Sequence, residues 1–81
     1  MNATTADMIR SRMHLRLDLP PPARCKALRE AAGLSQQEVA EAVGVTRQAV
    51  GHWETGARRP SGPILSRYME ALRVLEDAAA R

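Results

Sequence analysis

The chain has 81 residues and a net charge of +3, which fits one domain with a single core. Trp53 and Tyr68 are the only aromatic residues, so we expect an aliphatic core of the kind that packed helices form. The single cysteine, Cys25, excludes an intrachain disulfide and favours a reducing compartment. No apolar run approaches the roughly 20 residues of a membrane helix, and no signal peptide is evident. We therefore expect a cytoplasmic protein.

Residues 1–21 are predicted to form an N-terminal arm that precedes the folded domain. Residues 1–12 are polar without a clear period, and we expect them to be mobile, with a weak helix over 5–12 as the alternative. Over residues 13–19, apolar and polar side chains alternate with the period of a half-buried β-strand. Two interpretations stay open: an extended arm lying over the helices, or a strand that pairs with a second copy to make a dimer.

Three prolines, residues 20–22, form a rigid extended spacer before the first helix of the domain. Pro22 suits the first turn of that helix, which we predict to run to about Ala32 and to end at Gly33. Its inward face is predicted to be Ala27, Leu28 and Ala31.

Residues 33–56, GLSQQEVAEAVGVTRQAVGHWETG, predict two short helices joined by a tight turn. Ser35 opens the first helix, and Glu38 completes a capping box three residues later. Gly44 ends this helix, because a residue without Cβ enters the left-handed conformation without a steric penalty. Thr46 then caps the second helix.

The small and branched residues of this stretch fit two helices that cross steeply. Ala40 lets the backbones approach, Gly44 makes the corner, and Val50 fills the angle, with Trp53 on the same inward side. Residues 35–55 are therefore predicted to form a helix-turn-helix.

The C-terminal part begins with a loop rich in Arg, Gly and Pro. Ser61 or Gly62 can cap the last helix, with Pro63 at its first position. No Gly, Pro or Asn interrupts residues 64–80, so we predict one long helix. Its core-facing residues are predicted to run from Leu65 to Leu72. Because Leu75 is expected to extend past the core, the tail around Leu72 and Leu75 is a second candidate dimer surface.

The order and spacing of these residues resemble the helix-turn-helix domain of the Cro/cI (Xre-type) transcriptional regulators over roughly residues 22–72. The motifs that carry the resemblance are Gly33-Leu34-Ser35-Gln36, Val39-Ala40, Gly44-Val45-Thr46-Arg47, Val50 and Trp53-Glu54-x-Gly56. It implies an all-α, lambda-repressor-like bundle of four helices, or five, over residues 22–80. One long helix over 64–80 departs from the commoner family pattern, which has two short helices there.

The second helix of the motif is expected to lie in a DNA major groove with its first residues towards base edges. An amide such as Gln48 can bind adenine bidentately, and Arg47 can bind guanine in the same way. Carried over by the resemblance, the base-facing residues are Arg47, Gln48, Ala49 and His52. The residues expected at phosphates are Ser35, Gln36, Thr46, Thr55, Arg58, Arg59 and Ser61. Residues 44–67 hold four Arg against one Glu, which favours phosphate contacts.

The resemblance also implies a structural set of residues that holds the motif together. It pairs Arg29 with Glu54 in a partly buried ion pair, and it places Ala40, Gly44, Val50 and Trp53 at the packing positions. In this family, the residue matching Gln36 holds a phosphate and often braces the glutamine matching Gln48.

A glycine in the middle of the second helix, Gly51, is costly, because glycine is about 1 kcal/mol less favourable there than alanine. Close approach to the DNA backbone, or to the helix opened by Ser35, would explain it.

The resemblance implies a sequence-specific regulator of transcription that binds double-stranded DNA and acts as a dimeric repressor on a pseudo-palindromic operator. It would be of phage or plasmid type, or an antitoxin that controls its own operon, at the nucleoid of a bacterial or phage-infected cell. The alternative is a protein-interaction module on the same fold with little DNA binding, such as a toxin-neutralising antitoxin or an adaptor. No catalytic arrangement, metal-ligand spacing or cofactor motif is evident, so we expect no enzyme activity and no cofactor.

Overall fold

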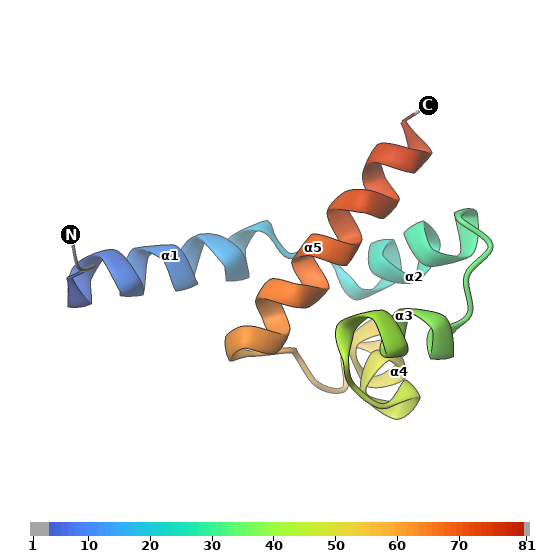
Figure 1. Cartoon of the computed structure of the whole chain (residues 1–81), viewed down its shortest axis with the longest axis horizontal. Helices are drawn as coiled ribbons and strands as arrows, with labels where there is room; N and C mark the ends of the chain where they lie inside the picture. The colour runs from blue at the N-terminus through green and yellow to red at the C-terminus, as the bar shows by residue number, and fades with distance from the viewer. Residues whose placement is uncertain (1–3, 81) are drawn as a thin grey trace.

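The structure, a computed structural model, describes residues 4–80 apart from the side chain of Leu15 and holds five α-helices and no strand in that range (Figure 1). In chain order the helices are α1 (Thr5–Asp18), α2 (Pro22–Ala31), α3 (Gln36–Val43), α4 (Arg47–Thr55) and α5 (Gly62–Ala79). α5 crosses the middle of the molecule, with α1 on one side and α2, α3 and α4 on the other (Figure 1). The predicted all-α fold is confirmed.

The segment before the prolines is helical, so the prediction of an extended arm or β-strand over residues 13–19 was wrong. Thr4 caps α1, accepting a hydrogen bond from the backbone N–H of Asp7 at 3.1 Å. Residues 13–19 contain no β-branched residue, and their Leu, Met and Arg are good helix formers. A helix also satisfies its own backbone groups, whereas a lone strand has no partner. Of the segment expected to be mobile, residues 1–3 lie outside the described residues, and residues 5–12 form the helix held as the alternative.

The core lies between α5 and the three helices α2, α3 and α4. Trp53 of α4 and Tyr68 of α5 contact each other there, with ring centroids 4.6 Å apart. α2 begins at Pro22 and ends before Gly33, as predicted. Of its predicted inward face only Leu28 is buried, whereas Ala27 and Ala31 are exposed, and Cys25 and Arg29 are buried in their place. The buried apolar residues are Cys25, Leu28, Val39, Ala40, Val43, Val50, Trp53, Leu65, Tyr68, Met69, Leu72 and Leu75. The helix-turn-helix is thus held from behind by α2 and α5.

The C-terminal helix is continuous, as predicted, but it does not extend past the core at Leu75. Leu72 and Leu75 are only 2% and 7% exposed, so the proposed dimer surface around them was wrong. The last turn of α2, which includes Ala31, lines a small pocket together with Leu75, so α2 extends along α5 as far as this residue. Val74, the neighbour of Leu75 in α5, is exposed, at 64%.

Candidate nucleic-acid interface

The turn between α3 and α4 has the local geometry that its residues predict. Ser35 accepts from the backbone N–H of Glu38 at 3.0 Å, and the Glu38 carboxylate accepts from the Ser35 N–H at 3.0 Å. Gly44 has φ +87° in the left-handed region, and its N–H donates to the Ala40 carbonyl at 2.8 Å. Thr46 caps α4 by accepting from the Ala49 N–H at 3.1 Å. These contacts fix the angle between the two helices.

A buried ion pair ties α4 to the rest of the domain. Arg29 donates through Nε to Oε2 of Glu54 at 2.7 Å and through Nη2 to Oε1 at 2.9 Å. Its third donor, Nη1, reaches the Leu34 carbonyl at 2.8 Å. Burial raises the pKa of Glu54, but the hydrogen bonds from Arg29 and Gln36 lower it more, and the pKa lies below its ordinary value. The hydrogen bond to Glu54 raises the pKa of Arg29. The ion pair that the resemblance implied is therefore present.

The amide of Gln36 joins this network, a contact that sequence reasoning missed. Its Nε2 donates to Oε1 of Glu54 at 3.2 Å, whereas we expected it beside Gln48. Three helices, α2, α3 and α4, therefore meet at a single carboxylate. No spacing in the sequence could reveal this contact, because it depends on how α3 and α4 are placed in space.

The outward face of α4 borders a hollow of about 420 Å³. Arg47 and Gln48 are exposed there, and His52 is half-buried. The residues that line the hollow are Gln36, Arg47, Gln48, Gly51, His52 and Thr55. Three of the four residues expected to face bases, Arg47, Gln48 and His52, are thus brought together, and Gly51 lies among them.

A second hollow of about 420 Å³ lies on the other flank of α4, next to the loop that follows it. Ala49, the fourth residue expected to face bases, lies here and packs partly against the core. Arg58 and Arg59 border the same hollow. The backbone N–H of Arg58 donates to the His52 carbonyl at 3.3 Å, which holds the start of this loop against α4.

The remaining residues expected at phosphates have hydroxyl groups at helix ends. The oxygens of Ser35 and Thr46 accept cap hydrogen bonds, which leaves their O–H groups as donors. Thr55 donates to the His52 carbonyl at 3.2 Å. Ser61 stands at the N-cap of α5, makes no side-chain cap bond, and lines neither hollow.

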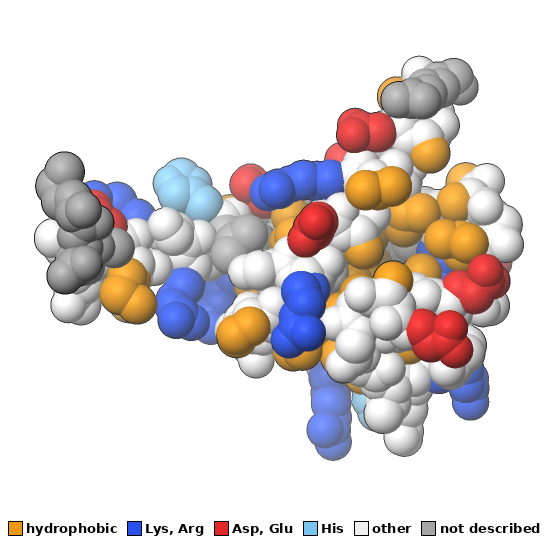
Figure 2. All heavy atoms as spheres, in the orientation of Figure 1, with side chains coloured by type: hydrophobic (Ala, Val, Ile, Leu, Met, Phe, Trp, Pro, Cys, Tyr) orange, Lys and Arg blue, Asp and Glu red, His pale blue; other side chains and the backbone are white. Residues whose placement is uncertain are grey.

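The charge that this region presents to solvent is positive. Glu54 is the only acid in residues 44–67, and its charge is paired internally with Arg29. The four arginines of this range, Arg47, Arg58, Arg59 and Arg67, are all exposed. Basic side chains project from the lower side of the molecule, around α4 (Figure 2). Unpaired arginines beside an exposed helix face are the electrostatic arrangement that a polyanion recognises.

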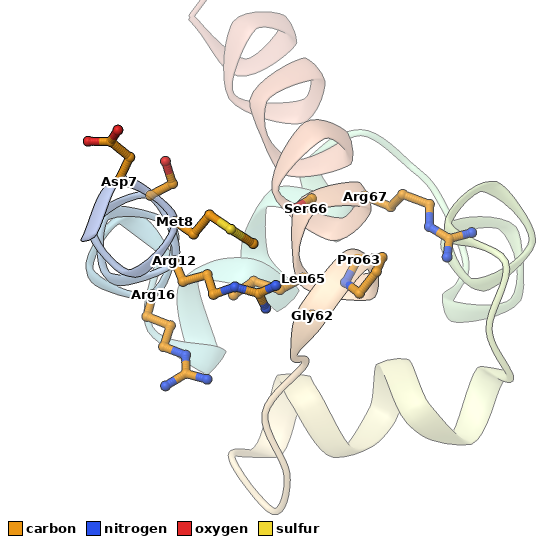
Figure 3. Close-up of a pocket in the computed structure, with 10 residues that line it drawn as sticks. Asp7, Met8, Arg12, Arg16, Gly62, Pro63, Leu65, Ser66 and Arg67 are labelled. Carbon is orange, nitrogen blue, oxygen red and sulfur yellow. The ribbon is translucent and has the colours of Figure 1, made fainter. Parts of the chain in front are cut away.

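A groove of about 600 Å³ lies elsewhere, between α1 and the first turns of α5 (Figure 3). Met8 and Arg12 of α1 point towards α5, whereas Arg67 points towards the turn between α3 and α4 (Figure 3). On its other side α1 exposes Ile9, Met13 and Leu17, which are four residues apart and so share one face. This apolar face is 53–77% exposed and has no contact within the described residues that would cover it.

Fold and site together define a helix-turn-helix nucleic-acid-binding domain. The model of the helix-turn-helix family matches residues 26–77, which is more than half of the chain. The chain therefore belongs to this family, the Cro/cI (Xre) type of DNA-binding helix-turn-helix regulator. Comparison with the curated proteins and with the solved structures gives no match.

Among residues 4–80, no three His, Cys, Asp or Glu side chains lie together in a way that would hold a metal ion. In the same part of the chain, each helix is too short or too polar to cross a membrane.

Proposed function

We propose that the protein is a sequence-specific regulator of transcription that inserts α4 into the major groove of double-stranded DNA. The observation that carries this proposal is the division of α4 into two faces. Val50, Trp53 and Glu54 are buried, whereas Arg47 and Gln48 are exposed at the start of the helix without a role in the core. A rigidly held helix with free polar side chains at its N-terminal end is suited to reading base edges.

The base-reading roles follow from side-chain chemistry. Gln48 offers one donor and one acceptor, which match N7 and N6 of adenine, and Arg47 offers paired donors for O6 and N7 of guanine. Ala49 is short and apolar, which suits contact with a thymine methyl group. His52 lies one turn further along and serves a purine or a neighbouring phosphate.

The phosphate contacts position the domain on the duplex. The first turns of α3 and α4 offer free backbone N–H groups, with the hydroxyls of Ser35 and Thr46 beside them. Arg58 and Arg59 extend the contact along the strand, and Ser61 follows them. Gln36 completes this set through the second N–H of its amide. The hydroxyl of Thr55 joins it when its O–H turns from the His52 carbonyl to a phosphate oxygen.

We infer that residues 22–80 form the DNA-binding domain and that α1 is an addition to it. The protein acts as a dimer whose reading helices lie about 34 Å apart on a pseudo-palindromic operator, as a repressor of phage, plasmid or antitoxin type. The exposed face of Ile9, Met13 and Leu17 supplies the contact between the two copies.

The same apolar face supports a second candidate function, an adaptor or antitoxin that binds a different protein. Exposed apolar residues that share one helix face are a common feature of protein interfaces. Under this alternative the reading face of α4 is unimportant, and α1 alone carries the function.

Selection of bound duplexes from a random pool at moderate salt tests the proposal. The wild-type chain is compared with the double variant Arg47→Ala, Gln48→Ala, and the matched control is Arg73→Ala, an exposed arginine of α5 outside both hollows. We expect two inverted half-sites for the wild type and the control, and no enrichment for the double variant. An unstructured pool with steep salt dependence would mean phosphate attraction alone, and it would contradict sequence-specific binding.

A third variant, Met13→Glu with Leu17→Glu, separates the two uses of α1. If the face joins two copies, the variant selects single half-sites and sediments as a monomer. If it retains paired half-sites, the dimer contact lies elsewhere and the face is free for another protein.

A further inference from the structure

Gly51 is the one glycine of the chain whose backbone does not require glycine. The other four glycines, Gly33, Gly44, Gly56 and Gly62, have positive φ, whereas Gly51 lies inside α4 with helical geometry. Because glycine is unfavourable in a helix interior, its presence there needs another reason.

The interior of the protein does not supply that reason. A Cβ built at Gly51 would lie 3.7 Å from Nε2 and 3.8 Å from Oε1 of Gln36, which are ordinary van der Waals distances. Alanine therefore fits between α3 and α4 without displacing either helix. The prediction that close approach to the preceding helix explains the glycine is thus excluded, and the approach must come from outside.

The position of Gly51 in α4 indicates which kind of partner approaches it from outside. It lies four residues after Arg47 and three after Gln48, so the three residues share the outward face of α4. The missing side chain deepens the hollow on that face, and the Gln36 amide forms its wall. Gln36 gives one N–H to Glu54, which leaves its second N–H for the phosphate proposed above and its carbonyl oxygen as an acceptor in the hollow.

The lining of the hollow distinguishes a base from a phosphate. Gln36 and Gln48 bring acceptors as well as donors, and Arg47, His52 and Thr55 add further polar groups. Phosphate oxygens only accept hydrogen bonds, whereas base edges in the major groove offer both donors and acceptors. Three of the four residues proposed to read bases, Arg47, Gln48 and His52, line the same hollow, so a base edge bound by them lies next to Gly51.

We propose that Gly51 is a specificity-determining residue: its missing side chain admits the edge of one base into the hollow beside Gln36. This inference rests on the proposed DNA-binding function. It assigns sequence discrimination to a residue that has no side chain with which to form a hydrogen bond.

The test is Gly51→Ala, measured for thermal stability and for affinity to both the selected operator and a random duplex. We expect the midpoint of thermal unfolding to rise by about 4 °C, since alanine favours the helix. Affinity for the operator should fall by about 10-fold, the effect of one mismatched base pair, with non-specific affinity unchanged. A gain in stability with a loss of specific binding cannot result from a damaged fold.

The matched control is Ser66→Ala, which introduces the same residue at an exposed position of α5 far from α4. It should leave the affinity for both duplexes unchanged. Equal losses on operator and random DNA would overturn the inference, because the DNA backbone would then be what approaches Gly51. Unchanged or tighter operator binding would also overturn it. Failure of the wild type itself to select an operator would instead refute the proposed function.

Discussion

Replacement of Arg29 by methionine should leave the carboxylate of Glu54 buried without its partner. The Glu54 side chain is 2% exposed and that of Arg29 is 10% exposed, so water cannot take the place of the lost guanidinium. Two charged hydrogen bonds, at 2.7 and 2.9 Å, disappear together. Gln36 alone still donates to the carboxylate.

The expected loss is about 3–5 kcal/mol of unfolding free energy, the cost of breaking a buried pair from one side. A domain of this length has a total stability of about 4–12 kcal/mol. The variant should therefore unfold about 12 °C or more below the wild type, at about 4–8 °C for each kcal/mol. The double variant Arg29→Met, Glu54→Leu removes both charges and should recover most of the loss.

Urea unfolding followed by the fluorescence of Trp53, the only tryptophan, measures both variants. The direction in which the unfolding free energy changes with pH gives an independent test. In the wild type the pKa of Glu54 lies below its ordinary value, so the pair's contribution is complete at pH values above the ordinary pKa of a glutamate and is lost as the pH falls through the lowered pKa. In Arg29→Met, burial without a partner raises the pKa of Glu54, so stability should increase as the pH falls from 7 towards 5.

The matched control is Arg10→Met, which breaks the exposed pair of Arg10 and Asp7. Their side chains are 68% and 55% exposed, and such pairs contribute about 0–1 kcal/mol. An Arg29→Met variant that loses no more than this control, or that follows the wild-type pH dependence, would refute the buried pair as a structural tie.

Two further predictions concern the turn and the phosphate contacts. Gly44→Ala should cost about 1–2 kcal/mol of unfolding free energy in urea titrations, because alanine is strained at φ +87°. Gly33→Ala, at φ +74°, is its matched comparison, and a neutral effect at both positions would contradict the reasoning. Arg58→Gln should weaken DNA binding uniformly across sequences and lower the slope of log affinity against log salt by about 1. A changed operator preference would instead place Arg58 at a base.

The features that the sequence predicted well are those set by a few neighbouring residues. Local sterics and hydrogen bonds determine the capping box of Ser35 and Glu38, the left-handed Gly44 and the cap at Thr46. The helix-turn-helix can therefore be predicted without a structure. Arg29 and Glu54 lie 25 residues apart in the sequence, and their pairing was predicted only from the family resemblance.

The predictions that failed concern contacts set by the rest of the fold. The alternation over residues 13–19 spans only seven positions, and a strand there would have needed a partner, so helix propensity decided the outcome. The burial of Leu75 depends on how far α2 extends along α5, which the pattern of α5 alone does not contain. The hydrogen bond from Gln36 to Glu54 follows from the angle between α3 and α4.

The division of α4 into a buried and an exposed face has a consequence for how such a protein changes over generations. Val50, Trp53 and Glu54 hold the helix in place, whereas Arg47, Gln48 and Gly51 take no part in the core. Substitutions on the exposed face therefore leave the scaffold intact, and under the proposed function the preferred operator can change without a loss of stability. Because the two faces of α4 are separate, the outward residues of another helix can be grafted onto its exposed face without a change to the core.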